Sequence, residues 1–274
     1  MTLWDTLKKE IVREFDYSLE QCKDKKYNDW LRYDIISKCL HPQEKDMGRD
    51  LYPFLDPKMN NFPDHAEGDP TIARKGMSSV TIQQLYYMKL MKQAFGNRRY
   101  TNILEIGGGY GNGAKIWHEW GHMGTYTICD FPELHRIQKH FLATVCHKHI
   151  EENPKIIDGP GEVIFNIDGI ERQSQSGMMN VEYKGLKDCW KHKGGLLQAT
   201  FSMSEMPLPN RVWIENNLKN YDFIFIAHNT HFDGVDNKTY FEKLRENKLK
   251  DYTTYHVPCD VKARTWYLIA ERNT

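Results

Sequence analysis

The sequence lacks any continuous run of about 18 apolar residues, so a membrane-spanning helix is not expected. Its first residues also lack the basic and then apolar pattern of a secretory signal peptide. Lys+Arg and Asp+Glu both total 37, so the chain shows no overall basic excess of the kind that proteins binding a nucleic-acid backbone normally have, which leaves only a local basic patch open. These absences predict a cytoplasmic protein that binds neither a membrane nor nucleic acid.

The six cysteines include no CxxC pair. This scatter argues against a structural zinc site and against a disulfide framework. Reduced thiols in the core or on the surface are the expected state.

The bulk composition is that of a globular protein. The chain has 274 residues, of which 40% are hydrophobic and 27% charged. This length favours one α/β domain with an appendage. We expect residues 1–75 to form an N-terminal helical region that acts as a lid over the active site. Residues 76–274 are expected to form the main domain.

Within the main domain, short strands and helices alternate, which predicts a doubly wound, mostly parallel sheet. We expect seven strands, with an antiparallel hairpin from the last two because no helix separates them. Two segments, 162–167 and 178–184, compete for the third strand; the second is preferred because it leaves a short crossover to the next strand. The other strands are predicted at 102–106, 125–129, 196–203, 221–227, 252–257 and 265–270. The first helix is predicted to end at Phe95 and to be capped by Ser78 or Ser79. The other helices are predicted at 112–120, 132–145, 209–218 and 238–249.

The most informative segment is Ile103-Leu-Glu-Ile-Gly-Gly-Gly-Tyr-Gly111, in which a strand leads into glycines and then a helix. Glycines permit tight turns and close approach of the backbone to a ligand. The helix N-terminus beyond them offers free N–H groups. Both dinucleotides and S-adenosylmethionine bind to bends of this kind.

Two features favour S-adenosylmethionine over a dinucleotide, although Gly109-Tyr-Gly111-Asn-Gly-Ala114 also fits the dinucleotide fingerprint. Glu105 would lie awkwardly beside a pyrophosphate, yet it suits a ligand that carries a sulfonium and an ammonium group. The glycines also begin two residues before the fingerprint does. An NAD(P)-dependent oxidoreductase therefore remains the alternative from another class.

Glu105-Ile-Gly-Gly-Gly-Tyr-Gly111 resembles motif I of the class I S-adenosylmethionine-dependent methyltransferases, which have a Rossmann-like fold. Cys129-Asp130-Phe-Pro-Glu-Leu134 resembles the acidic turn whose carboxylate binds the ribose in that family. More narrowly, these motifs and Ser202-Met-Ser-Glu-Met-Pro207 are similar to a bacterial family of sugar O-methyltransferases. The similarity covers roughly residues 66 to 240.

The resemblance implies S-adenosyl-L-methionine as the cofactor and a small-molecule acceptor, namely a sugar, a nucleotide sugar or a phosphorylated compound. A homodimer is compatible with it, and no metal site is predicted. A phosphate- or phosphoramidate-type oxygen is the second candidate for the methylated group. The predicted cofactor-binding residues are Glu105, Gly107, Gly108, Gly109, Tyr110, Gly111, Asp130, Phe131 and Ser204.

Transfer to an alcohol needs a base as well as alignment of the reacting atoms. In an open α/β sheet, such a base lies beyond the carboxyl ends of the strands. Glu205 follows the fourth predicted strand, and His228 and His231 follow the fifth. Histidine titrates near neutrality, so His228, directly at the end of its strand, is the first choice.

Overall fold

The computed structural model describes residues 9, 13, 72–74, 77–145, 163–164, 179–260 and 262–273. The predicted N-terminal helical lid region, residues 1–75, lies almost entirely outside these residues. Within the described part of the chain, no helix is long and apolar enough to cross a membrane.

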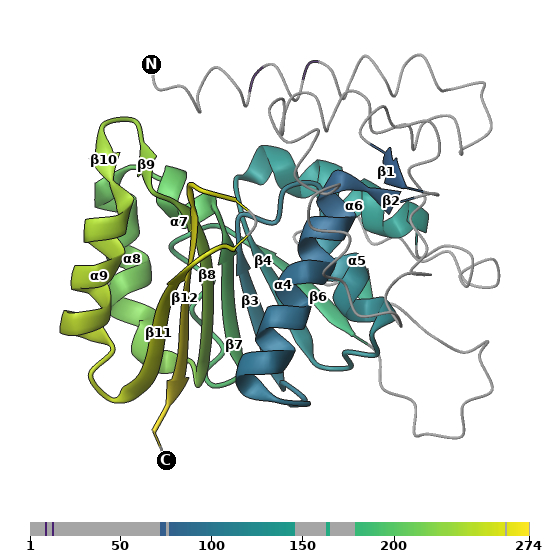
Figure 1. The fold of residues 1–274 in the computed structure, drawn as a ribbon. Helices are drawn as coiled ribbons and strands as arrows, with labels where there is room; N and C mark the ends of the chain where they lie inside the picture. Colours follow the sequence, from purple (N-terminus) through teal and green to yellow (C-terminus); the bar gives the residue numbers. More distant parts are fainter. Residues whose placement is uncertain are drawn as a thin grey trace.

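A mixed eight-stranded sheet forms the centre of the molecule (Figure 1). Its strands, in spatial order, are β11 (Tyr252–Pro258), β12 (Thr265–Arg272), β8 (Phe223–Asn229), β7 (Leu196–Thr200), β3 (Asn102–Ile106), β4 (Thr125–Cys129), β6 (Asn180–Lys184) and β5 (Val163–Ile164). Strands β6, β4, β3, β7 and β8 are parallel, whereas β12 is antiparallel to both of its neighbours. The predicted mostly parallel, seven-stranded α/β sheet with an antiparallel last strand is therefore confirmed. The short β5 adds an eighth strand, antiparallel to β6.

The strand order departs from that of a dinucleotide-binding sheet. When the short strand β5 is left out and the other seven strands of this sheet are numbered along the chain, their spatial order from β6 to β11 is 3-2-1-4-5-7-6. The dinucleotide-binding order is 3-2-1-4-5-6. Here the last strand, β12, lies between the fifth strand, β8, and the sixth, β11.

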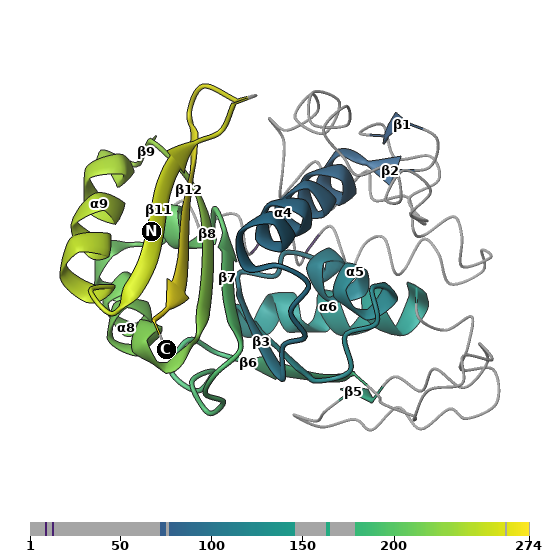
Figure 2. The ribbon, with the colours of Figure 1, turned by 60° about the horizontal axis from the view of Figure 1, so that its bottom comes forward.

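Helices cover both faces of the sheet (Figure 2). On one side lie α4 (Ser79–Phe95), α5 (Asn112–Glu119) and α6 (Pro132–Val145). On the other side lie α8 (Leu208–Asn217), continued by η5 (Leu218–Asn220), and α9 (Asn237–Lys248). Two small hairpins lie outside the main sheet: β1 (Ile72–Arg74) with β2 (Met77–Ser78), and β9 (His231–Phe232) with β10 (Val235–Asp236).

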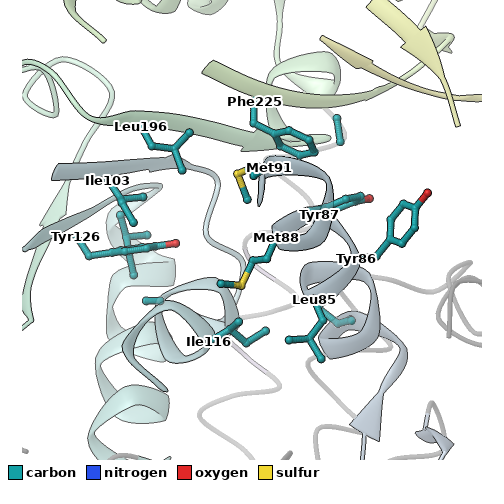
Figure 3. Close-up of a cluster of buried hydrophobic side chains, with 14 of the residues drawn as sticks. Leu85, Tyr86, Tyr87, Met88, Met91, Ile103, Ile116, Tyr126, Leu196 and Phe225 are labelled. Carbon is teal, nitrogen blue, oxygen red and sulfur yellow. The ribbon is translucent and has the colours of Figure 1, made fainter. Parts of the chain in front are cut away.

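Helix α4 anchors one hydrophobic core against the sheet (Figure 3). Tyr87 is buried between Phe225 of β8 and Tyr267 of β12, with ring centroids 5.6 and 5.9 Å away. A second core fills the space between the sheet and helices α8 and α9. The two cores hold the carboxyl ends of β3, β4, β7 and β8 at one edge of the sheet.

The predicted fourth strand, 196–203, is too long. β7 ends at Thr200, and the chain turns directly into the short helix α7 (Ser202–Glu205). The predicted fifth strand, 221–227, instead continues to Asn229 as β8. The preferred third strand is confirmed, because β6 pairs in parallel with β4.

Candidate cofactor site and active site

The glycine bend lies between the end of β3 and the start of α5. Gly107, Gly109 and Gly111 have φ angles of +75°, +57° and +104°, which residues with a Cβ rarely adopt. A Cβ on Gly107 would lie 2.3 Å from Cβ of Ser202, so the bend also packs tightly against α7. The hydroxyl of Ser202 donates to the Ile106 carbonyl and fixes this contact. The bend after β3 is therefore packed and hydrogen-bonded against the start of α7, which follows β7.

Asp130, directly after β4, is hydrogen-bonded to the same bend. Its carboxylate accepts from the Phe131 backbone N–H at 2.8 Å and from Nε2 of Gln138 at 3.0 Å. The backbone N–H groups of Gly108 and Gly109 also hydrogen-bond to it. The predicted ribose-binding carboxylate and the glycine bend thus lie together.

Glu105 lies beneath the bend, with only 1% of the residue exposed. Its carboxylate accepts from the Tyr126 hydroxyl at 2.9 Å and from Nε2 of Gln198 at 3.2 Å. A Cβ on Gly113 of α5 would lie 2.4 Å from Oε1 of Glu105. The carboxylate is therefore enclosed by β4, β7 and α5, and protein groups separate it from solvent.

Both carboxyl groups have raised pKa values. Burial raises the pKa of Glu105 to about 7 because it disfavours the charged form, and the nearby Asp130 adds to the effect. Burial likewise raises the pKa of Asp130 to about 7, against the lowering effect of its N–H donors. Perturbed carboxyl groups are frequent at functional sites.

Three other residues predicted to bind the cofactor have different surroundings. Tyr110 is buried, and its ring meets that of Phe141 at 5.0 Å, so its side chain belongs to the core. Phe131 packs partly against the same core and contributes its backbone N–H to Asp130. Ser204 is fully buried, and its hydroxyl donates to the Phe201 carbonyl. The Ser204 hydroxyl is therefore engaged within the protein, and the assignment of Ser204 to the cofactor site stays a prediction.

His228 does not have the surroundings of a base. It is fully buried in β8, where its ring stacks on Phe241 of α9 with centroids 4.2 Å apart. Nδ1 lies 3.0 Å from the Asn229 carbonyl, which assigns a proton to Nδ1, and Nε2 lies 2.9 Å from Nε2 of His256. Burial lowers the pKa of His228 to about 3. These surroundings do not favour His228 as the base, because Nε2 is buried against His256, and its role stays a prediction.

Glu205 and His231 lie nearer the surface. Glu205 ends α7 and is partly exposed. His231 is exposed in β9, with Nε2 3.9 Å from Oδ1 of Asp236. Because α7 contacts β9, the structure brings these two predicted residues to the same end of the sheet.

The residue after β7 has an unusual backbone conformation. Phe201 has a φ angle of +67°, which is uncommon for a bulky residue and is held by a hydrogen bond from its N–H to Ala227. The Nζ atom of Lys262 lies 5.9 Å from the centre of its ring. A strained residue and a cation therefore lie at the carboxyl edge, and the sequence patterns did not indicate the strain.

Sequence reasoning also missed two buried glutamines. Gln138 hydrogen-bonds to Asp130, and Gln198 hydrogen-bonds to Glu105. Gln138 lies in the otherwise apolar stripe of α6, and Gln198 lies in the apolar strand β7. A polar residue inside an apolar pattern was the signal available, since buried amides require partners.

No family model and no curated protein match the chain. Among solved structures, it is similar to a chain of the Pnkp1/Rnl/Hen1 RNA repair complex, with 12% identity and a TM-score of 0.42 over 68% of this chain and 40% of that chain. It is also similar to the glycopeptide N-methyltransferase MtfA, with 9% identity and a TM-score of 0.45 over 69% and 90% of the two chains. The magnesium protoporphyrin IX methyltransferase ChlM from Synechocystis PCC 6803, with bound SAM, gives 9% identity and a TM-score of 0.45 over 71% and 81%. These scores are low, so the fold assignment depends on the strand order of the chain itself.

Proposed function

We propose that this protein is an S-adenosylmethionine-dependent O-methyltransferase that acts on a small polar acceptor, a sugar or nucleotide-sugar hydroxyl being the first choice. The observation that carries the proposal is the glycine bend hydrogen-bonded to Asp130 and underlain by Glu105. The strand order supports it against a dinucleotide, because β12 separates the fifth and sixth strands.

The residues present fit this cofactor. S-adenosylmethionine carries a sulfonium and an ammonium group, and two carboxyl groups with raised pKa values lie at the bend. A nearby cation favours the charged form of a carboxyl and lowers its pKa. In this proposal, the backbone of Gly107–Gly111 holds the methionine end, Asp130 holds the ribose hydroxyls, and Glu105 supplies negative charge from below without direct contact.

The acceptor needs orientation and a base. In-line transfer depends on alignment of the acceptor oxygen with the methyl group and the sulfur, which the carboxyl edge would provide. Glu205 and His231 remain as bases, since His228 is enclosed. Asp236 lies beside His231, with Oδ1 3.9 Å from Nε2, which is beyond hydrogen-bond distance.

A phosphate- or phosphoramidate-type oxygen is the second acceptor class. Lys262 supports it, because this cation lies over the Phe201 ring directly after β7. The positively charged ammonium group of Lys262 would attract an anionic group of the acceptor at the edge of the active site.

The test has two stages. Calorimetric titration with S-adenosylmethionine and with NAD(P) should give binding of the first alone, and binding of NAD(P) alone would replace the proposal with the oxidoreductase. Asp130→Ala, titrated in the same way, tests whether S-adenosylmethionine binds at this site.

An acceptor screen with methyl-labelled cofactor, read by mass spectrometry, should then give a labelled sugar or nucleotide sugar. Label only on a phosphorylated acceptor would select the second class, and binding without any transfer would indicate a non-catalytic binding protein.

A further inference from the structure

The side chain of Gln138 bridges the two halves of the candidate cofactor site. Its Nε2 donates to the Gly109 carbonyl at 2.9 Å and to Oδ2 of Asp130 at 3.0 Å. Both partners are acceptors, so the orientation of the amide is fixed, with the NH₂ group toward the bend. A single fully buried side chain thus connects the glycine bend after β3 with the acid after β4.

The other end of this amide differs from that of the second glutamine. Oε1 of Gln198 accepts from Nε1 of Trp117 at 3.1 Å, so that amide is satisfied at both ends. Oε1 of Gln138 is buried and has no hydrogen-bond partner within the described structure. An unpaired buried acceptor is unfavourable for folding. The cost of the unpaired Oε1 is offset by the two hydrogen bonds that Nε2 donates, and an apolar residue of the α6 stripe would supply neither of them.

We propose that Gln138 is the positioning residue of the nucleoside site, which aligns the Asp130 carboxylate with the glycine bend before the cofactor binds. This inference depends on the proposed function. Gln138 acts through Asp130, and it is expected to determine where the ribose hydroxyls find their acceptor. The same hydrogen bond stabilises the ionised form of Asp130, so the loss of Gln138 also changes the pH at which that acceptor is available.

Three variants test the role. Gln138→Leu removes both donors, and Gln138→Glu keeps the shape but places an acid beside Asp130. Gln83→Leu is the matched control, because it removes another buried helical glutamine, one that donates to Tyr87 of α4. Each is titrated with S-adenosylmethionine between about pH 6 and about pH 9, a range that brackets the raised carboxyl pKa values. Thermal unfolding of each variant is recorded in parallel.

The wild type should bind more tightly as pH rises, since Asp130 must be ionised to accept from hydroxyls. The titratable groups that interact with Asp130, Glu105 of β3 and Cys129 of β4, are unchanged in all variants. Gln138→Leu should weaken binding by about tenfold or more, the effect of one lost hydrogen bond to a charged group, and should move the rise to higher pH. Gln138→Glu should show the opposite trend, because its acid can donate to Asp130 only while protonated and repels it once ionised.

The outcomes separate the two proposals. If the wild type does not bind S-adenosylmethionine, the proposed function fails. If it binds and Gln138→Leu has the same affinity and pH profile, the inference about Gln138 is overturned. Equal changes in Gln83→Leu would overturn it as well, since they would reflect only the loss of a buried amide. If Gln138→Leu does not fold, the reversed pH trend of Gln138→Glu decides the question.

Discussion

Replacing Gly113 with alanine tests whether Glu105 really packs against the first turn of α5. Gly113 is the second residue of that helix and has an ordinary helical backbone. In an unobstructed helix, Gly→Ala stabilises by up to about 1 kcal/mol. Here the new Cβ would lie 2.4 Å from Oε1 and 3.0 Å from both Cδ and Oε2 of Glu105. Gly113→Ala is therefore expected to destabilise the protein, whereas helix propensity alone predicts that it stabilises.

The magnitude follows from what holds the carboxylate in place. Glu105 cannot move aside freely, because Tyr126 and Gln198 hydrogen-bond to its two oxygens. Overpacking of this kind costs about 1–3 kcal/mol, and weakening one hydrogen bond to a charged group adds about 1.5–3 kcal/mol. After subtraction of the propensity gain, Gly113→Ala should lower the free energy of unfolding by about 2 kcal/mol or more.

The assay is a double-mutant cycle measured by urea denaturation. In a Glu105→Ala background the Cβ has room, so Gly113→Ala should stabilise by up to about 1 kcal/mol. The two effects then differ by about 3 kcal/mol, well above the deviation from additivity of independent sites. Thermal midpoints give a second reading, at about 2–4 °C per kcal/mol for a chain of nearly this size. If Gly113→Ala stabilises both backgrounds equally, Glu105 does not lie against α5 and the reasoning is refuted.

Three further predictions concern the site. Asp130→Ala should weaken binding of S-adenosylmethionine by about 1–3 kcal/mol in calorimetry, and an unchanged affinity would exclude Asp130 from the role. The pKa of Glu105 is raised to about 7 in the folded protein, above its unfolded value, so its contribution to stability is present in acid and lost as pH rises through about 7. Glu105→Gln should therefore flatten the fall in unfolding free energy between about pH 5 and about pH 8, whereas an identical slope in both proteins would contradict the burial of that carboxyl. His231→Ala or Glu205→Gln should lower turnover with little change in cofactor affinity. His228→Ala should instead lower thermal stability and leave the turnover of the folded fraction intact. A selective loss of turnover in His228→Ala would assign the role of the base to His228.

Local patterns were sufficient to predict the bend and the sheet. The glycines after β3 follow directly from backbone geometry, because three of them have positive φ angles. The strand β6 could be chosen over the segment at 162–167 from the length of its crossover alone. These predictions needed only residues that are neighbours in the sequence.

The orientation of His228 could not be predicted in the same way. Residues 224–228 of β8 are all buried, so the strand gives no alternation that would tell one face from the other. In the structure, His228 shares the face of Ile224 and Ile226, which pack toward α8 and α9. Its partner His256 lies two strands away in the sheet and 28 residues later in the sequence. Such a contact depends on the insertion of β12 between β8 and β11, which no local pattern contains.

The carboxyl groups of Glu105 and Asp130 at the bend favour a cationic ligand over an anionic one. A pyrophosphate near Glu105 and Asp130 would raise both pKa values further, because like charges disfavour ionisation. A cation would lower them and so release protons near neutral pH, where both groups are partly protonated in the free protein. Binding of a sulfonium ligand should therefore be accompanied by proton release that a dinucleotide would not cause. The sign of this proton exchange depends on the charge of the ligand beside the bend, so it distinguishes the two cofactor classes even without an acceptor.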